Sequence, residues 1–407
     1  YTPFRQDRLF LCFGHCIYVT GYSHYTGFPS NCKGHREIFF VSLLRFDSLF
    51  ANIKKKTKEA HEMENRKYSI AEVAEICHVS KATVSRVINN SPNGVSEKTR
   101  QQVLKTIEEL NYRPNALARS VATARSGMIG LIVPDVSNFF YPKVIRGVMD
   151  YMDSKGYSVI VGNSDYDPAK EAKQLLNLVD KRVDGIILCS GTSNKKFLTE
   201  FRKYRIPIGL LGRSFDMALS DVSITGDNVK GAEKSVEYLV RGGHRKIAYA
   251  EGSFQVSGGI QRMKGYRQAH LAAGIPVDER LLLDGDYTIE FGRSVADRLL
   301  DGKISFDAIM TGSDLVAIGV VSRLRERGIR VPEDIEVIGY DDIELASVFD
   351  PQLSTISKPH YDMARYVATH LLKIIEGEKA ILPHTVIEPH LVLRNTTRPR
   401  TWDAEYK

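Results

Sequence analysis

Residues 127–350 alternate short, nearly uninterrupted apolar runs with longer amphipathic segments. Runs that are apolar on both faces are typical of strands in a parallel sheet that helices cover on both sides. The predicted strands are MIGLIV, YSVIVGN, VDGIIL, PIGLL, KIAYAEG, DAIMTG and IEVIGY. The predicted helices are FYPKVIRGVMDYMDSKG, KEAKQLLNLVDKR, NVKGAEKSVEYLVRGG, GIQRMKGYRQAHLAAG and LVAIGVVSRLRERG. This alternation predicts an α/β fold built on parallel sheets.

The α/β stretch is longer than one sheet of this kind usually needs, so we expect two Rossmann-like lobes. One lobe is centred on residues 127–224 and the other on 226–350. The chain is expected to cross back near 351–360, and residues 361–398 then complete the first lobe.

A crevice between the lobes is the expected ligand site, because such sheets bind ligands at the carboxyl ends of their strands. Several polar and aromatic residues follow the predicted strands. Each also has a plain structural reading, since Asp341 could cap a helix and Tyr287 could belong to the core. The candidate effector-binding residues are Asp135, Asn138, Phe139, Phe140, Ser190, Arg213, Arg262, Tyr287, Ser313, Asp314 and Asp341.

The net charge of +7 is concentrated in the first third of the chain. Residues 1–62 carry 9 Lys and Arg against 5 Asp and Glu, and residues 63–126 carry 10 against 6. Residues 127–407 carry 37 against 38 and are therefore close to neutral. A basic module joined to a neutral one is typical of a nucleic-acid-binding domain attached to another domain, although a solvated charged face gives the same excess.

Three short helices are predicted downstream of Ser69. Ser69 and Glu72 have the spacing of a capping box, and Ser80 and Ser96 can cap the second and third helices. Two short helices joined by a tight turn and followed by a third describe a helix-turn-helix, although a small protein-binding bundle has the same spacing. The expected buried stripes are Ile70, Val73, Ala74 and Cys77, then Val84, Val87 and Ile88, then Val103, Leu104, Ile107 and Leu110.

The second helix carries small and hydroxyl-bearing residues on its predicted exposed face. A helix in the major groove needs such a face to approach base edges and phosphates closely. Lys81, Ala82 and Arg86 are predicted to face bases, and Arg86 can bind guanine with two hydrogen bonds. The other predicted DNA contacts of the three helices are Ser69, Ser80, Thr83, Ser85, Asn89, Ser96, Thr99 and Tyr112.

The segment YSIAEVAEICHVSKATVSRVINNSPNGVSEKTRQQVLKTIEELNYRPNALARSVATARS strongly resembles the headpiece of the LacI/GalR (lactose/galactose repressor) family of bacterial transcriptional regulators. The resemblance extends from about residue 67 to 398. It implies that Lys81, Ala82 and Arg86 read the major groove. This chain has His78 where the family usually has Gly in the turn, and His tolerates a left-handed backbone better than most residues.

The resemblance also implies a hinge helix at residues 114–126 that orders on DNA and inserts a wedge into the minor groove. Val121 stands where the family has leucine, and it is shorter and β-branched, so we expect a weaker kink. An ordinary linker helix remains the alternative. The hinge residues predicted to contact DNA are Asn115, Ala118, Arg119 and Val121.

The α/β part resembles the family's inducer domain, which is similar to periplasmic sugar-binding proteins. The resemblance implies that Arg262 anchors effector hydroxyls, that Asp341 lies on the opposite wall, and that Tyr287 stacks on the ligand. Ser313 stands where many relatives have Asn, and Gly212 stands where many have Asp. The identity of the effector therefore stays open among sugars, phosphosugars, nucleobases and a partner protein.

Residues 1–62 lack the periodicity of the rest, and the first methionine is Met63. We expect translation to start at Met63 naturally, with residues 1–62 an atypical and non-native extension. A small zinc site is the alternative, from the spacing of Cys12, Cys16, Cys32 and His35. The expected domains are 63–113 for DNA binding, 114–126 for the hinge, 127–398 for effector binding and dimerisation, and 399–407 as a tail.

The sequence contains no phosphate-binding loop, nucleophile elbow or zinc-protease motif, so we expect no enzymatic activity, cofactor or metal. Five scattered cysteines and the absence of a secretion signal indicate a cytoplasmic protein. We expect a homodimeric repressor that binds a pseudo-palindromic operator and responds to a small molecule, with a sugar as the leading class. A sugar-binding sensor that acts through protein contacts is the alternative.

Overall fold

The computed structural model describes residues 12–13, 16–17, 68–91, 94–113, 125–189, 191, 195–214, 217–378 and 384–406. The chain divides into two units, Tyr1–Pro114 and Asn115–Lys407. Near the N-terminus the described elements are the antiparallel strands β1 (Cys12–Phe13) and β2 (Cys16–Ile17). The zinc alternative depends on side chains that lie outside the described residues.

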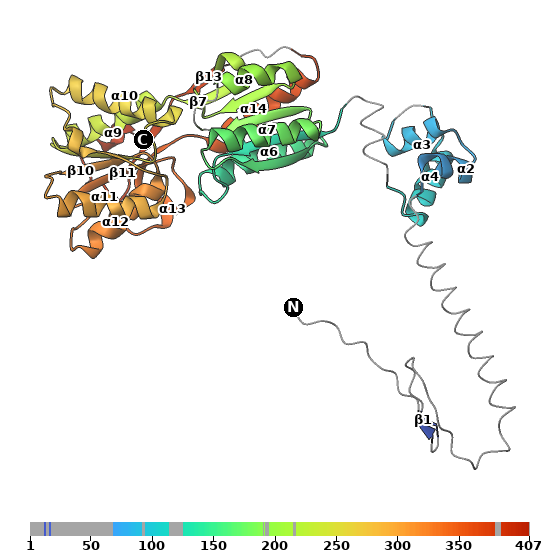
Figure 1. The fold of residues 1–407 in the computed structure, drawn as a ribbon, viewed down its shortest axis with the longest axis horizontal. Helices are drawn as coiled ribbons and strands as arrows, with labels where there is room; N and C mark the ends of the chain where they lie inside the picture. The colour runs from blue at the N-terminus through green and yellow to red at the C-terminus, as the bar shows by residue number, and fades with distance from the viewer. Residues whose placement is uncertain are drawn as a thin grey trace, which may run out of the picture. The chain divides into compact units, whose positions relative to one another are not determined.

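Three helices, α2 (Ile70–Ile76), α3 (Lys81–Ile88) and α4 (Glu97–Glu109), pack together in the first unit (Figure 1). The capping predictions are confirmed, because Ser69 and Glu72 form the full capping box and the Ser80 and Ser96 side chains accept backbone N–H groups. The turn between α2 and α3 contains His78 at a φ of 53°, the left-handed conformation that the sequence required.

The core of this three-helix unit contains most of the predicted apolar stripes. Val73, Val84 and Val103 are fully buried, one from each helix. The prediction for Leu104 was wrong, because its side chain is 47% exposed. Helix α4 meets its neighbours along Val103 and Ile107, and Leu104 lies one position around from that line.

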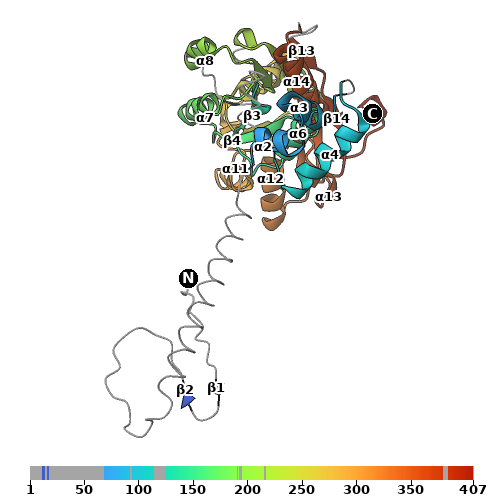
Figure 2. The ribbon, with the colours of Figure 1, turned by 90° about the vertical axis from the view of Figure 1, so that its right-hand side faces the viewer.

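The first lobe of the second unit is a parallel sheet with the strand order β13-β7-β6-β5-β3-β4. Helices α6 (Tyr141–Ser154) and α14 (His360–Ile375) cover one face, and α7 (Pro168–Asp180) and α8 (Lys195–Phe201) cover the other (Figure 2). Neighbouring residues of one strand therefore enter different cores, which explains why the strands are apolar throughout. The strands are β3 (Met128–Val133), β4 (Ser158–Asn163), β5 (Gly185–Cys189), β6 (Ile208–Leu211), β7 (Val222–Gly226) and β13 (His384–Ile387).

The second lobe has the strand order β14-β12-β11-β10-β8-β9, in which only β14 is antiparallel among the described strands. Helices α9 (Asn228–Arg241) and α10 (Ser257–Ala272) pack on one face. Helices α11 (Ile289–Asp301), α12 (Asp314–Glu326) and α13 (Glu344–Val348) pack on the other. The strands are β8 (Ile247–Glu251), β9 (Leu282–Asp284), β10 (Ala308–Thr311), β11 (Glu336–Tyr340), β12 (Ser354–Ser357) and β14 (His390–Val392).

The chain crosses between the lobes three times, after β7, after β12 and between β13 and β14. The prediction that residues 361–398 complete the first lobe holds for α14 and β13. It was wrong from His390 onward, because β14 pairs with β12 in the second lobe. Short 3-10 turns occupy Arg202–Tyr204, Met217–Leu219, Glu279–Leu281 and Asp403–Tyr406.

Glu336, fully buried at the start of β11, fastens the last segment of the chain to the second lobe. Its carboxylate accepts hydrogen bonds from Arg398 Nε at 2.7 Å and Arg400 Nη2 at 2.8 Å. His244 Nε2 lies 3.2 Å from Glu336 Oε1, and His244 Nδ1 lies 3.5 Å from Asp307 Oδ1. Burial opposes the charged imidazole, but the interactions with Asp307 and Glu336 outweigh it and raise the pKa of His244.

Candidate functional site

The outer face of α3 carries small side chains and hydrogen-bond donors. Lys81, Ala82 and Arg86 are exposed, whereas Val84 and Val87 on the opposite face are buried in the three-helix core. A face of this kind suits the major groove, because bulky apolar side chains would hold the helix away from the base edges.

Some of the other predicted DNA contacts lie at the helix ends. Ser80 Oγ lies 2.9 Å from Thr83 Oγ1, and Ser96 Oγ lies 2.8 Å from Thr99 Oγ1, so each cap engages a neighbouring hydroxyl. These hydroxyls can also donate outward to phosphate oxygens. Tyr112 is only 8% exposed and packs in the three-helix core, so the structure gives it a packing role.

The remaining predicted DNA contacts divide between described and undescribed residues. Ser69 and Asn89 are exposed, Ser85 is partly exposed, and Asn89 Nδ2 donates to Ser85 Oγ at 3.3 Å. The hinge predictions lie outside the described residues and concern Asn115, Ala118, Arg119 and Val121.

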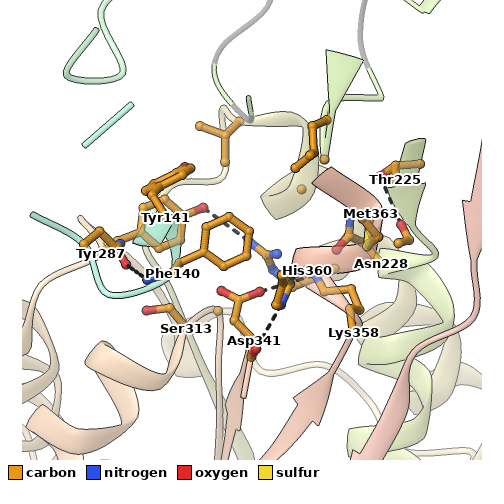
Figure 3. Close-up of a pocket in the computed structure, with 18 of the residues that line it drawn as sticks. Phe140, Tyr141, Thr225, Asn228, Tyr287, Ser313, Asp341, Lys358, His360 and Met363 are labelled. Carbon is orange, nitrogen blue, oxygen red and sulfur yellow. Dashed lines mark hydrogen bonds and ion pairs between the residues drawn. The ribbon is translucent and has the colours of Figure 1, made fainter. Parts of the chain in front are cut away.

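A cavity of about 60 Å³ lies between the lobes of the second unit. Small-molecule sites usually measure roughly 300–1,000 Å³, so this cleft is nearly closed and a sugar-sized ligand requires it to open. Its walls come from both lobes and from the crossing segments after β7 and β12 (Figure 3). The predicted residues that line it are Asn138, Phe140, Arg262, Tyr287, Ser313 and Asp341.

Glu251, fully buried at the end of β8, organises one wall of the cleft. Arg262 Nε and Nη2 donate to its two carboxylate oxygens at 2.9 and 2.7 Å. The Tyr287 hydroxyl donates to the same carboxylate at 2.8 Å, and the Tyr249 hydroxyl donates to it as well. Among the described residues nothing accepts from Arg262 Nη1, so these donors remain available to a ligand.

Lys358 and Asp341 form a second charged pair in the cleft, with Nζ 3.3 Å from Oδ1. Burial lowers the pKa of Lys358, although Asp341 opposes that shift. His360 Nε2 donates to the Asp341 carbonyl at 2.9 Å, and these three residues lie together in Figure 3. Burial and the nearby Lys358 lower the pKa of His360 to about 4, so its ring is neutral near pH 7.

Aromatic rings close the cleft from both lobes. Tyr166, between β4 and α7, stacks on Tyr287, between β9 and α11, with ring centres 5.4 Å apart and planes 28° apart. The Phe140 ring meets His360 edge-on at 4.5 Å. The stacking of Tyr166 on Tyr287 is thus a direct contact between the lobes.

Two predicted effector residues are buried behind the cleft and do not line it. Arg213 is fully buried, and its Nη1 donates to Glu171 Oε2 at 2.6 Å within the first lobe. Asp314 accepts from the Thr355 hydroxyl at 2.5 Å and from a backbone N–H, and burial raises its pKa well above the ordinary value. Neither side chain lines the cavity, so these residues support the site from behind it.

The other departures concern the segment after β3. Phe139 is 52% exposed, and Asp135 accepts hydrogen bonds from Ser137 and does not line the cavity. The prediction for Ser190 lies outside the described residues. Within that segment the cavity is lined by Asn138 and Phe140, because the chain enters α6 there.

Sequence reasoning missed several residues of the cleft. Lys358 and His360 follow β12, whose sequence STIS is too polar to be recognised as a buried strand. Thr225 lies in β7, another hydroxyl-containing strand, and Asn228 begins α9 at the first crossing. A scan for charged or polar residues at every crossing between lobes would have found them.

The described part of the chain contains no group of three His, Cys, Asp or Glu side chains arranged to hold a metal ion. In the same residues, no helix combines the length and apolar character needed to span a bilayer.

Two protein-family models match the chain. Residues 69–115 match the model of bacterial regulatory proteins of the lacI family, and residues 236–397 match a periplasmic binding protein-like domain. Catabolite control protein A of Priestia megaterium is 36% identical over 332 residues, which cover 81% of this chain and 99% of that protein.

Solved structures show the same likeness. The Lac repressor dimer bound to operator and the anti-inducer ONPF has a TM-score of 0.74 and 27% identity, covering 82% of this chain and 100% of that chain. The complex of the transcriptional regulator CelR with cellobiose has a TM-score of 0.62 and 31% identity, covering 81% of this chain and 100% of that chain.

Proposed function

The chain belongs to the LacI family of bacterial regulatory proteins, and from that premise we propose how its parts carry out transcriptional regulation. Residues 63–126 bind operator DNA, and the lobes of residues 127–398 bind a small-molecule effector that controls DNA binding. The observation that supports this division is the donor-bearing outer face of α3 in the same chain as a polar cleft between two lobes.

DNA recognition is proposed to depend on α3. Arg86 and Lys81 supply long donors to base edges, while Ala82 lets the helix backbone approach them. The similar Lac repressor structure is a dimer bound to operator. A dimer of this chain would present two α3 helices to the two halves of a pseudo-palindromic site. In this role the protein acts as a repressor in the cytoplasm, where the DNA is.

Control by the effector is proposed to pass through the lobes. A ligand that stabilises one angle between the lobes changes how the two hinge segments of a dimer meet, and so changes operator affinity. A coupling free energy of about 1–3 kcal/mol shifts affinity roughly 5- to 150-fold. Because the cleft is nearly closed, the effector must either open it or select a more open state.

A sugar or sugar derivative is the proposed effector class. The cleft combines donors on Arg262, a carboxylate on Asp341 and the ring of Tyr287, whose face is uncovered when the stacked Tyr166 moves away as the cleft opens. Together these groups suit a hydroxylated ring. The similar CelR structure holds cellobiose. We propose that the cleft binds its ligand without catalysing a reaction, so that the protein is a regulator without enzymatic activity.

The test is a binding selection with random duplexes, run with and without a panel of sugars on the purified full chain. We expect enrichment of a pseudo-palindrome and a change in its affinity with at least one sugar. Arg86→Ala should lose the enrichment, whereas Arg267→Ala, in the second lobe, should keep it. Failure to enrich any duplex under all conditions would overturn the proposal.

A further inference from the structure

We propose that the Lys358–Asp341 pair makes the cleft selective for uncharged, hydroxyl-bearing ligands and excludes phosphorylated and acidic ones. The proposal rests on the proposed function only in taking this cleft as the effector site. Lys358 is thereby a specificity-determining residue located on a crossing segment between the lobes.

Each cation of the cleft has a carboxylate of its own. Arg262 is joined to Glu251 by two hydrogen bonds, and Glu251 is fully buried behind it. Lys358 is paired with Asp341, and both lie at the cavity surface with side chains 8% and 15% exposed. The walls described here therefore carry no excess charge of either sign.

The hydrogen-bonding groups left for a ligand are of both kinds. Glu251 already accepts four hydrogen bonds and offers nothing further. Arg262 Nη1 and the remaining N–H groups of Lys358 donate, while the second carboxylate oxygen of Asp341 accepts. A hydroxyl group needs one acceptor and one or two donors, so this set matches a polyol. A phosphate or carboxylate would use the donors but would face Asp341 at close range.

The fold holds the Lys358–Asp341 pair in place. Asp341 and Asp342 have consecutive left-handed φ values of 103° and 52°, a costly conformation that turns the chain after β11 at the cleft. The stem of Lys358 lies over Gly226, where any side chain would collide with it. Lys358 Nζ and the Arg262 guanidinium lie 4.6 and 4.7 Å from the centre of the Tyr340 ring, so the same aromatic ring contacts both cations.

Removing one charge of the pair should make the cleft bind ions that carry the same sign as the removed charge. Asp341→Asn leaves Lys358 without its carboxylate while preserving the shape, so the cleft gains an anion site. Lys358→Met leaves Asp341 alone, so the cleft gains a cation site. Lys358→Met combined with Asp341→Asn removes both charges and is the matched control for each single variant.

The experiment is a calorimetric titration of the full chain and of these variants with inorganic phosphate and with methylammonium. It is run at about pH 6, because a lysine keeps its proton more readily there than at higher pH. Wild type and the double variant should show equally weak phosphate binding. Asp341→Asn should bind phosphate at least about tenfold more tightly than either. Lys358→Met should gain methylammonium binding by a similar factor, which tests the proposal even where Asp341→Asn does not fold.

Two outcomes would overturn the proposal: phosphate binding by wild type that Lys358→Met abolishes, or no gain of binding by the single variants. Operator affinity of the same variants is measured separately. If wild type shows no sequence-specific DNA binding, the proposed function is refuted. The titrations still decide the charge selectivity of the cleft.

Discussion

Replacing Arg262 with methionine removes a guanidinium and leaves the buried carboxylate of Glu251 without an opposite charge. Methionine keeps an apolar stem over the Tyr340 ring, so packing changes little. Breaking a buried ion pair in this way usually costs about 3–5 kcal/mol. Because the Tyr249 and Tyr287 hydroxyls still donate to Glu251, we expect the lower part of that range.

The assay is urea-induced unfolding of the full chain, with Arg267→Met as the matched control. Arg267 lies on the same helix, α10, and also makes two hydrogen bonds to a glutamate, but that pair is exposed to solvent. The control should therefore change stability far less. Adding Glu251→Gln to Arg262→Met should recover most of the loss, because no charge is then buried.

The reasoning is refuted when Arg262→Met unfolds within about 1 kcal/mol of wild type, or when the double variant is no more stable than the single one.

Other predictions concern DNA, pH and the lobes. Arg86→Ala should relax base preference at one position of each half-site by about 1–3 kcal/mol, and an unchanged selection profile would contradict this. Because folding raises the pKa of His244, its protonation stabilises the fold below the unfolded pKa of about 6.5, and this stability is lost as the pH rises through the folded pKa. The His244→Gln variant should therefore flatten that part of the curve of unfolding free energy against pH, measured by urea unfolding. Tyr166→Ala removes a stacking contact worth about 0.5–1.5 kcal/mol and should raise the radius of gyration in X-ray scattering, and no increase would count against the closing role of Tyr287. Val121→Leu should tighten operator binding at matched salt in a titration, whereas equal affinity would remove the wedge hypothesis.

The sequence was most informative where burial is complete on both sides of a strand. The predicted strand MIGLIV is β3, with the same bounds. A strand between two helical layers has no solvent-exposed polar position, so its apolar run is easily recognised in the sequence. The strand STIS was missed, since Ser354 and Thr355 bury their hydroxyls against Thr397 and Asp314 and so hide the strand signal. Hydrogen bonds between residues distant in sequence cannot be predicted from the hydrophobic periodicity of a segment.

The site was predicted in part for a similar reason. Asp341 directly follows β11 and Arg262 lies on α10, the helix after β8, and both were predicted by the rule that ligands bind at the carboxyl ends of strands. Glu251 lies in the predicted strand KIAYAEG and was not among the candidate residues, although its four hydrogen bonds make it the centre of one wall. Lys358 follows no recognisable strand, and the parallel pairing of β12 with β11, in which Ile356 is opposite Tyr340, brings it to Asp341.

The triple crossing of the chain between the lobes governs the order in which the protein can be completed during synthesis. Neither lobe is a continuous stretch, because the first needs β13 and the second needs β14 and the arginines that meet Glu336. The core of the three helices at residues 70–109 needs nothing beyond Tyr112. A growing chain on the ribosome can therefore complete the three-helix unit first. The two lobes can be completed only when the end of the chain has emerged.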